Sequence, residues 1–198
     1  MTLVKTNPLQ ALISAAAKVT PNGDELARHR SRTSIAERLD APRLVLADVS
    51  SSMAERAGVT SKIGLLKLAL TGQSFTTLVA FASRPVVVES PELLPPPCGG
   101  TALHLALGLS ATFAPGRTLV ISDGQPDDKE AALLAAVSVS GVIDTLYVGP
   151  DDDLEAVRFM RDLARIGSGR AIVNDLRRTH GAQLRQHVGA LLLPPVRP

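Results

Sequence analysis

Short apolar runs alternate with longer segments of helical periodicity along most of this chain. The runs are rich in Val, Ile and Leu and have the length of buried strands, whereas the segments between them place apolar residues on one helical face. This pattern predicts strands at 43–48, 75–82, 85–89, 117–122, 142–148 and 171–174. It predicts helices at 62–70, 101–112, 127–139 and 182–192, and one more that opens at 151–153. Such alternation indicates an α/β fold with a doubly wound, mostly parallel sheet of about six strands and helices on both faces.

One pair of predicted strands departs from the parallel pattern. Only Ser83 and Arg84 separate the run at 75–82 from the run at 85–89. A link this short permits a hairpin but not a parallel crossover. Pro85 begins the second run, and proline is tolerated on an edge strand because its missing N–H faces no partner there. We therefore expect one antiparallel strand at the edge of the sheet.

The first part of the chain has a different pattern. Asn7 and Pro8 predict the start of a helix that runs to about residue 19, and the Arg-rich stretch that follows allows only a short helix at 34–39. We divide the chain into an N-terminal helical and Arg-rich extension, residues 1–41, and an α/β domain, residues 42–198.

Composition narrows the class of protein. The chain has 198 residues, 45% of them hydrophobic, which suits a folded domain with a substantial core. Cys98 is the only cysteine, so an intrachain disulfide is excluded and a reducing cytoplasm is expected. No apolar run approaches the roughly 20 residues of a membrane-spanning helix. The net charge of +2 does not indicate a nucleic-acid binder.

Polar side chains gather where predicted strands end. The strand at 43–48 is followed by Ser50 and Ser52 and ends in Asp48, and the strand at 117–122 is followed by Asp123. Thr101 follows a Gly pair at the head of an apolar helix. The carboxyl ends of parallel strands are where open α/β sheets bind ligands. Carboxylate and hydroxyl oxygens suit a divalent cation that keeps some of its water.

This arrangement resembles the metal-ion-dependent adhesion site of the von Willebrand factor A family. In that family an Asp-x-Ser-x-Ser motif follows the first strand, a Thr comes from a later loop and an Asp follows a later strand. The resemblance covers residues 43–192 and includes Met53 and the Ser-Asp-Gly-x-Pro motif at 122–126. It implies that Asp48, Ser50, Ser52, Thr101 and Asp123 are metal ligands.

The resemblance also implies a function. The expected ion is Mg²⁺, with Ca²⁺ and Mn²⁺ left open, and the expected partner is another protein that contributes a Glu or Asp to the metal. The chain would then be an intracellular adaptor that binds its partner in a divalent-cation-dependent way. Members of this kind often work with AAA+ ring ATPases or in stress-response assemblies.

Two other functions remain open, namely a metal-dependent hydrolase and a structural subunit whose metal site is not used. We expect no enzyme, because the chain lacks a phosphate-binding Gly-x-x-x-x-Gly-Lys loop and a Gly-x-Ser-x-Gly nucleophile elbow. The oxygen-bearing residues also have a simpler interpretation as caps of loops and turns.

Three further features have two interpretations each. His104, one helical turn after Thr101, is either a ligand or a packing residue. Residues 151–153 are either a second metal site or a negatively charged helix start. From Arg158 to Arg185 there are seven Arg and two Asp, which form either a solvated face or a surface for an acidic partner or nucleic acid.

Overall fold

The computed structural model describes residues 41–178 and 181–193. The predicted N-terminal extension, with its helices at 7–19 and 34–39, lies outside the described residues. Its boundary with the α/β domain stays a prediction.

A six-stranded sheet forms the centre of the described domain, in the order β5-β4-β1-β6-β7-β8. All neighbouring strands are parallel except β4 and β5, which form the predicted antiparallel pair at the edge. The strands are β1 (Arg43–Asp48), β4 (Thr77–Phe81), β5 (Pro85–Val88), β6 (Arg117–Ser122), β7 (Val142–Tyr147) and β8 (Ser168–Val173). The sheet thus confirms the fold predicted from the pattern of apolar runs.

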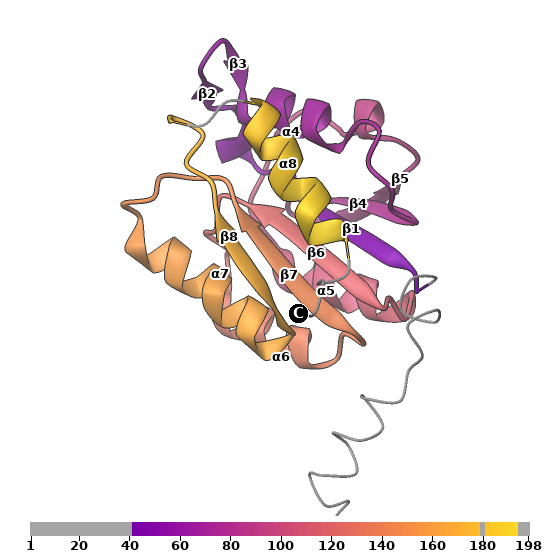
Figure 1. Cartoon of the computed structure of the whole chain (residues 1–198). Coiled ribbons are helices and arrows are strands. Elements are labelled where there is room, and N and C mark those ends of the chain that lie inside the picture. The colour runs from indigo at the N-terminus through magenta and orange to yellow at the C-terminus, as the bar shows by residue number, and fades with distance from the viewer. Residues whose placement is uncertain (1–40, 179–180, 194–198) are drawn as a thin grey trace, which may run out of the picture. The chain divides into compact units, whose positions relative to one another are not determined.

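Helices cover both faces of the sheet (Figure 1). One core lies under α4 and α8, and a second lies under α5, α6 and α7. The helices are α4 (Lys62–Leu70), α5 (Leu103–Thr112), α6 (Lys129–Val137), α7 (Leu154–Ile166) and α8 (Gly181–Leu192). The central strands β1 and β6 are buried on both faces, which explains why each reads as a nearly continuous apolar run.

Several short elements were not predicted. A two-stranded hairpin of β2 (Arg56–Ala57) and β3 (Thr60–Ser61) leads into α4, and 3₁₀ helices form at η1 (Ser51–Ala54) and η2 (Pro91–Leu93). The hairpin is too short to leave an alternating pattern in the sequence. It returns the chain so that the Lys62 amide donates to the Glu55 carbonyl over 2.9 Å.

The order of the strands defines where a ligand would bind. From β1 the chain adds β4 and β5 on one side, and then crosses to add β6, β7 and β8 on the other. The sheet therefore has a topological switch point between β1 and β6, the position at which open α/β sheets form a crevice. Asp48 ends β1 and Ser122 ends β6, so both lie at that point.

None of the helices in the described ranges is long and apolar enough to cross a membrane.

Candidate metal centre

The first predicted ligand, Asp48, is completely buried at the end of β1. Its Oδ2 accepts a hydrogen bond from the Ser122 hydroxyl at 2.6 Å, and its Oδ1 accepts one from the Ser50 amide at 2.8 Å. Burial raises the pKa of Asp48 to about 6, even though these hydrogen bonds favour the charged form and oppose the shift. The negative charge of Asp123 adds to the rise, so the two carboxylates interact electrostatically.

The two serines of the motif lie where the chain turns from β1 into η1. Ser50 has an extended backbone and precedes the 3₁₀ helix, and Ser52 lies within it. Their hydroxyl oxygens are 3.1 Å apart. Ser51, between them, donates from its hydroxyl to the Gly99 carbonyl and is exposed. The hydroxyls of Ser50 and Ser52 therefore lie together, whereas the hydroxyl of Ser51 contacts a different group.

The loop that carries Thr101 is hydrogen-bonded to the Asp48–Ser52 segment. The Cys98 amide donates to the Val49 carbonyl at 2.9 Å, and the Ser51 amide donates to the Gly99 carbonyl at 3.1 Å. Gly99 has a φ of +75°, a conformation that L side chains rarely adopt. The glycine thus allows the backbone conformation of this loop and its close approach to Ser83.

Thr101 is also fixed to the loop after β6. Its amide donates to Oδ1 of Asp127 at 2.9 Å, and its carbonyl accepts from the Asp127 amide at 3.0 Å. A side chain at Gly100 would meet the Asp127 carboxylate at 2.6 Å, so a glycine is needed next to this bridge. The Thr101 hydroxyl has no hydrogen-bond partner among the residues that the structure describes. Backbone groups therefore hold this residue and leave its hydroxyl available.

Asp123, which follows β6, forms an ion pair that the sequence did not indicate. Its Oδ2 lies 2.9 Å from Nζ of Lys62, and the same Nζ lies 2.7 Å from Oε2 of Glu55. Burial lowers the pKa of Lys62, but the hydrogen bonds and charges of Glu55 and Asp123 outweigh that effect and raise the pKa above its usual value. Lys62 is consequently a cation at neutral pH.

The five predicted ligands therefore lie on three segments that hydrogen bonds join at one edge of the sheet. This donor set fits a hard divalent cation. It offers two carboxylates, and its hydroxyls have few competing partners within the described residues. No group of three His, Cys, Asp or Glu side chains in the described ranges is arranged to hold a metal. The candidate site differs from such a cluster, because three of its five proposed ligands are Ser and Thr hydroxyls and only two are carboxylates.

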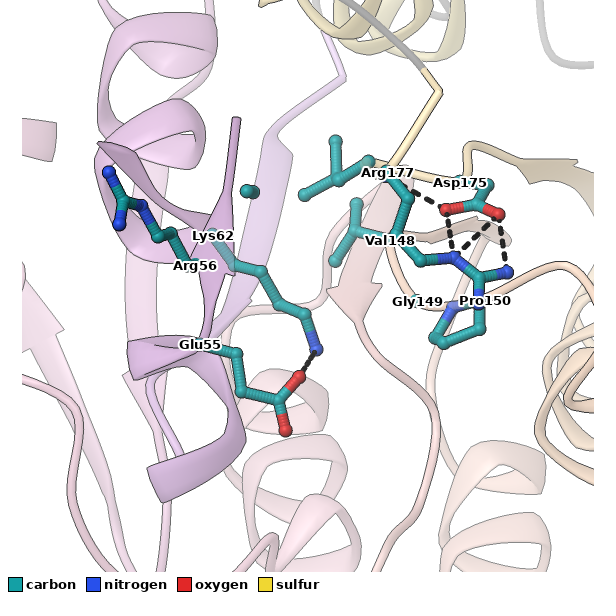
Figure 2. Close-up of a pocket in the computed structure, with 10 residues that line it drawn as sticks. Glu55, Arg56, Lys62, Val148, Gly149, Pro150, Asp175 and Arg177 are labelled. Carbon is teal, nitrogen blue, oxygen red and sulfur yellow. Dashed lines mark hydrogen bonds and ion pairs between the residues drawn. The ribbon is translucent and has the colours of Figure 1, made fainter. Parts of the chain in front are cut away.

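A pocket of about 120 Å³ lies beside this edge. Lys62 and residues 55–57 line one part of it, and the segments after β7 and β8 line the rest. Figure 2 shows Lys62 and Glu55 pointing toward each other, and Arg177 paired with Asp175 across from them. Lys62 is thus common to the pocket and to the candidate metal centre.

The Asp residues at 151–153 have structural partners. The Asp153 side chain caps α7 by accepting from the Ala156 amide at 3.0 Å. Asp152 pairs with Arg177 at 3.0 Å, and Asp151 pairs with Arg178 at 2.8 Å. These contacts support the helix-start interpretation of the cluster.

The basic stretch from Arg158 to Arg185 is partly neutralised within the described residues. Four of its seven arginines form ion pairs with Asp side chains of the described residues, namely Arg165, Arg170, Arg177 and Arg178. Arg170 contacts the buried Asp144 in β7 and also donates to the Leu191 carbonyl at the end of α8. These contacts favour an intramolecular role for this stretch.

His104 lies on α5 and is half-buried. Its Nδ1 is buried and has no hydrogen-bond partner within the described residues. A ligand role for His104 stays untested.

Comparison with protein-family models and with curated proteins finds no match for this chain. Solved structures do match it. The crystal structure of manganese-loaded Plasmodium vivax TRAP protein is similar over 78% of this chain and 72% of that chain, with a TM-score of 0.52 and 16% identity. At this identity the similarity shows the fold alone. The fold is α/β and von Willebrand factor A-like, in agreement with the resemblance drawn from the motifs.

Proposed function

We propose that this chain is a divalent-cation-dependent protein-interaction module. The observation that supports this proposal is that hydrogen bonds join three segments with oxygen-bearing side chains at the switch point of the sheet. These segments follow β1, precede α5 and follow β6. The proposed metal ligands are Asp48, Ser50, Ser52, Thr101 and Asp123.

In this proposal the ligands have two roles. Asp48 and Asp123 supply the negative charge that attracts a cation. Ser50, Ser52 and Thr101 supply neutral oxygens that do not cancel the charge of the ion. A hard cation held in this way provides an electron-poor position for an anionic oxygen. A Glu or Asp side chain of a partner protein is the group that we propose for that position.

Mg²⁺ is the ion that we propose, because it prefers hard oxygen ligands and keeps part of its hydration shell. The similar solved structure is described as manganese-loaded, which supports a divalent cation in a fold of this kind. Calcium and manganese remain alternatives. The identity of the partner, including an AAA+ ATPase or a stress-response assembly, stays an expectation from the family resemblance, as does a cytoplasmic location.

The experiment that tests the proposal is a pull-down with the full chain as bait, in Mg²⁺ and in chelator. The double variant Ser50→Ala, Ser52→Ala should lose the Mg²⁺-dependent partners. A matched control is Ser138→Ala, Ser140→Ala, which removes two hydroxyls just before β7, at the opposite end of the parallel strands from the proposed ligands. Retention of the same partners in chelator, or by the Ser50, Ser52 variant, would contradict the proposal.

The two other functions have tests of their own. Turnover of phosphoester substrates that depends on metal and on Asp48 would indicate a hydrolase. Assembly that is unchanged in chelator would indicate a structural subunit.

A further inference from the structure

Lys62 is a buried ammonium at the candidate metal centre. Its side chain is 9% exposed and contacts Asp123, which is 8% exposed, and Glu55, which is 63% exposed. One of its two partners, Asp123, is therefore a proposed metal ligand. The other, Glu55, is a long side chain in contact with solvent.

The position of Lys62 is unfavourable for a cation in two respects. It has lost most of its hydration, which is costly for a charged group. It is also the first residue of α4, where the helix dipole is positive and disfavours a cation. Within residues 41–178 and 181–193, the two carboxylates are the only ion-pair partners that offset these costs, so the ammonium is held at this place by specific partners.

We propose that Lys62 is a tethered cation that competes with the divalent metal for Asp123, and that Glu55 is the acceptor that keeps Lys62 when the metal binds. This inference rests on the proposed metal site and goes beyond it, because it assigns the control of metal affinity to a residue outside the ligand set.

The charges explain the competition. A divalent cation beside Asp123 would stand close to the Lys62 ammonium, and like charges at such separations repel strongly in a partly buried site. The flexible stem of Lys62 can turn its ammonium away from Asp123, since the same Nζ already contacts Glu55, and Glu55 and Lys62 both line the 120 Å³ pocket, which Asp123 does not line. Without metal, Lys62 neutralises Asp123 and limits its repulsion of Asp48. Metal binding must then displace this internal cation, which lowers the affinity of the site.

A positioning role for Lys62 would give the opposite change in affinity. Lys62 could orient Asp123 and leave Oδ1 for the metal, in which case removing the ammonium would weaken binding. The direction of the change in affinity therefore decides between competition and positioning.

The experiment is a calorimetric titration of the full chain with MnCl₂. Lys62→Met keeps the apolar stem and removes the charge, and it should bind Mn²⁺ about tenfold more tightly than the parent or better. Lys62→Arg keeps the charge and is the matched control, with an affinity within about threefold of the parent. Lys62→Gln provides a second neutral variant should the methionine variant fold poorly, as judged by circular dichroism.

A second arm tests Glu55. Glu55→Gln leaves Lys62 with Asp123 alone, so it should weaken Mn²⁺ binding about fivefold in the parent. In the Lys62→Met background the same change should alter affinity less than about twofold, because there is no ammonium to hold. An equal loss in both backgrounds would mean that Glu55 acts through its own charge, and the role given to it would be wrong.

The outcomes separate this inference from the proposed function. Equal or weaker binding by the neutral variants, with a parent that binds Mn²⁺, overturns the competition and leaves the metal site intact. Binding by Lys62→Met alone supports the competition. Absence of binding in the parent and in both neutral variants at millimolar Mn²⁺ overturns both proposals.

Discussion

The hydroxyl of Ser122 donates to Oδ2 of Asp48 over 2.6 Å and thereby joins the ends of β6 and β1 inside the protein. The same hydroxyl accepts a hydrogen bond from the Gly124 amide at 2.9 Å. Ser122 is not among the proposed metal ligands, yet it contacts one ligand and immediately precedes another. Ser122 therefore orients the Asp48 carboxylate.

Ser122→Ala should destabilise the metal-free protein by about 2 kcal/mol at pH 8, because a buried carboxylate loses a hydrogen bond to its charged form. Urea unfolding in chelator measures the change. Ser110→Ala is the control, since Ser110 is equally buried but its hydroxyl donates only to the neutral Leu107 carbonyl at 2.8 Å. We expect a loss of about 1 kcal/mol or less there. Equal losses in the two variants would show that the charge of Asp48 does not matter.

Substitution by alanine at two glycines should change the stability of the protein in opposite directions. Gly99 has a φ of +75°, and a side chain there would lie 2.5 Å from the Ser83 hydroxyl. Gly99→Ala should therefore cost about 2 kcal/mol of stability. Gly108 lies inside α5, and nothing lies within 4 Å of a side chain placed there. Gly108→Ala should stabilise the protein by about 0.5–1 kcal/mol, because alanine favours the helix. Thermal unfolding of both variants measures the two changes in stability. Stabilisation by Gly99→Ala would contradict the structure of the loop that carries Gly99.

The pair of Arg177 and Asp175 should make stability depend on pH at the acidic end. The hydrogen bonds from Arg177 lower the pKa of Asp175 to about 2, below its value of 3.8 in an unfolded chain. A carboxyl whose pKa is lower in the folded state stabilises the protein above its unfolded pKa, and this contribution is lost as the pH falls through the folded pKa. The window for Asp175 therefore runs from about pH 4 down to about pH 2.

Arg177→Gln should consequently lower the free energy of unfolding at pH 7, and its difference from the parent should shrink from pH 4 toward pH 2. Denaturant unfolding at several pH values measures this. Arg158→Gln is the control, because Arg158 forms no ion pair among the described residues and its effect should not follow the same window. A constant effect of Arg177→Gln across the range would rule out the linkage to Asp175.

Much of the fold could be predicted because its central strands are buried on both faces. The central strands β1 and β6 begin and end at the residues that their apolar runs predicted, since apolar residues fill nearly all of their interior positions. Helix starts were less accurate. The predicted helix at 101–112 begins only at Leu103, because Thr101 and Ala102 use their backbone groups to contact Asp127 and Ala82 instead.

The candidate site could be predicted only in part. Asp48 and Asp123 follow buried strands, and parallel strands bring such positions to one edge of the sheet. Lys62 and Glu55 could not be found in this way, because their meeting depends on the β2–β3 hairpin, which contains only two residues in each strand. A lysine at the first position of a helix, where the dipole disfavours it, is the one local signal that could have drawn attention to Lys62.

The sharpest prediction for the proposed metal centre concerns the hydroxyl of Thr101. The backbone of this residue is held by Asp127, and its hydroxyl has no hydrogen-bond partner in the described part of the chain. Thr101→Val keeps the shape and removes only the hydroxyl, so the stability of the metal-free protein should change by less than about 1 kcal/mol. The parent should gain about 2.7 kcal/mol when Mg²⁺ reaches 100 times its dissociation constant, by mass action. Thr101→Val should lose most of this gain and Thr101→Ser should keep it, because serine restores the oxygen. Thermal unfolding with and without Mg²⁺ measures all three proteins, and a full metal response in Thr101→Val would remove Thr101 from the ligand set while leaving the fold as described.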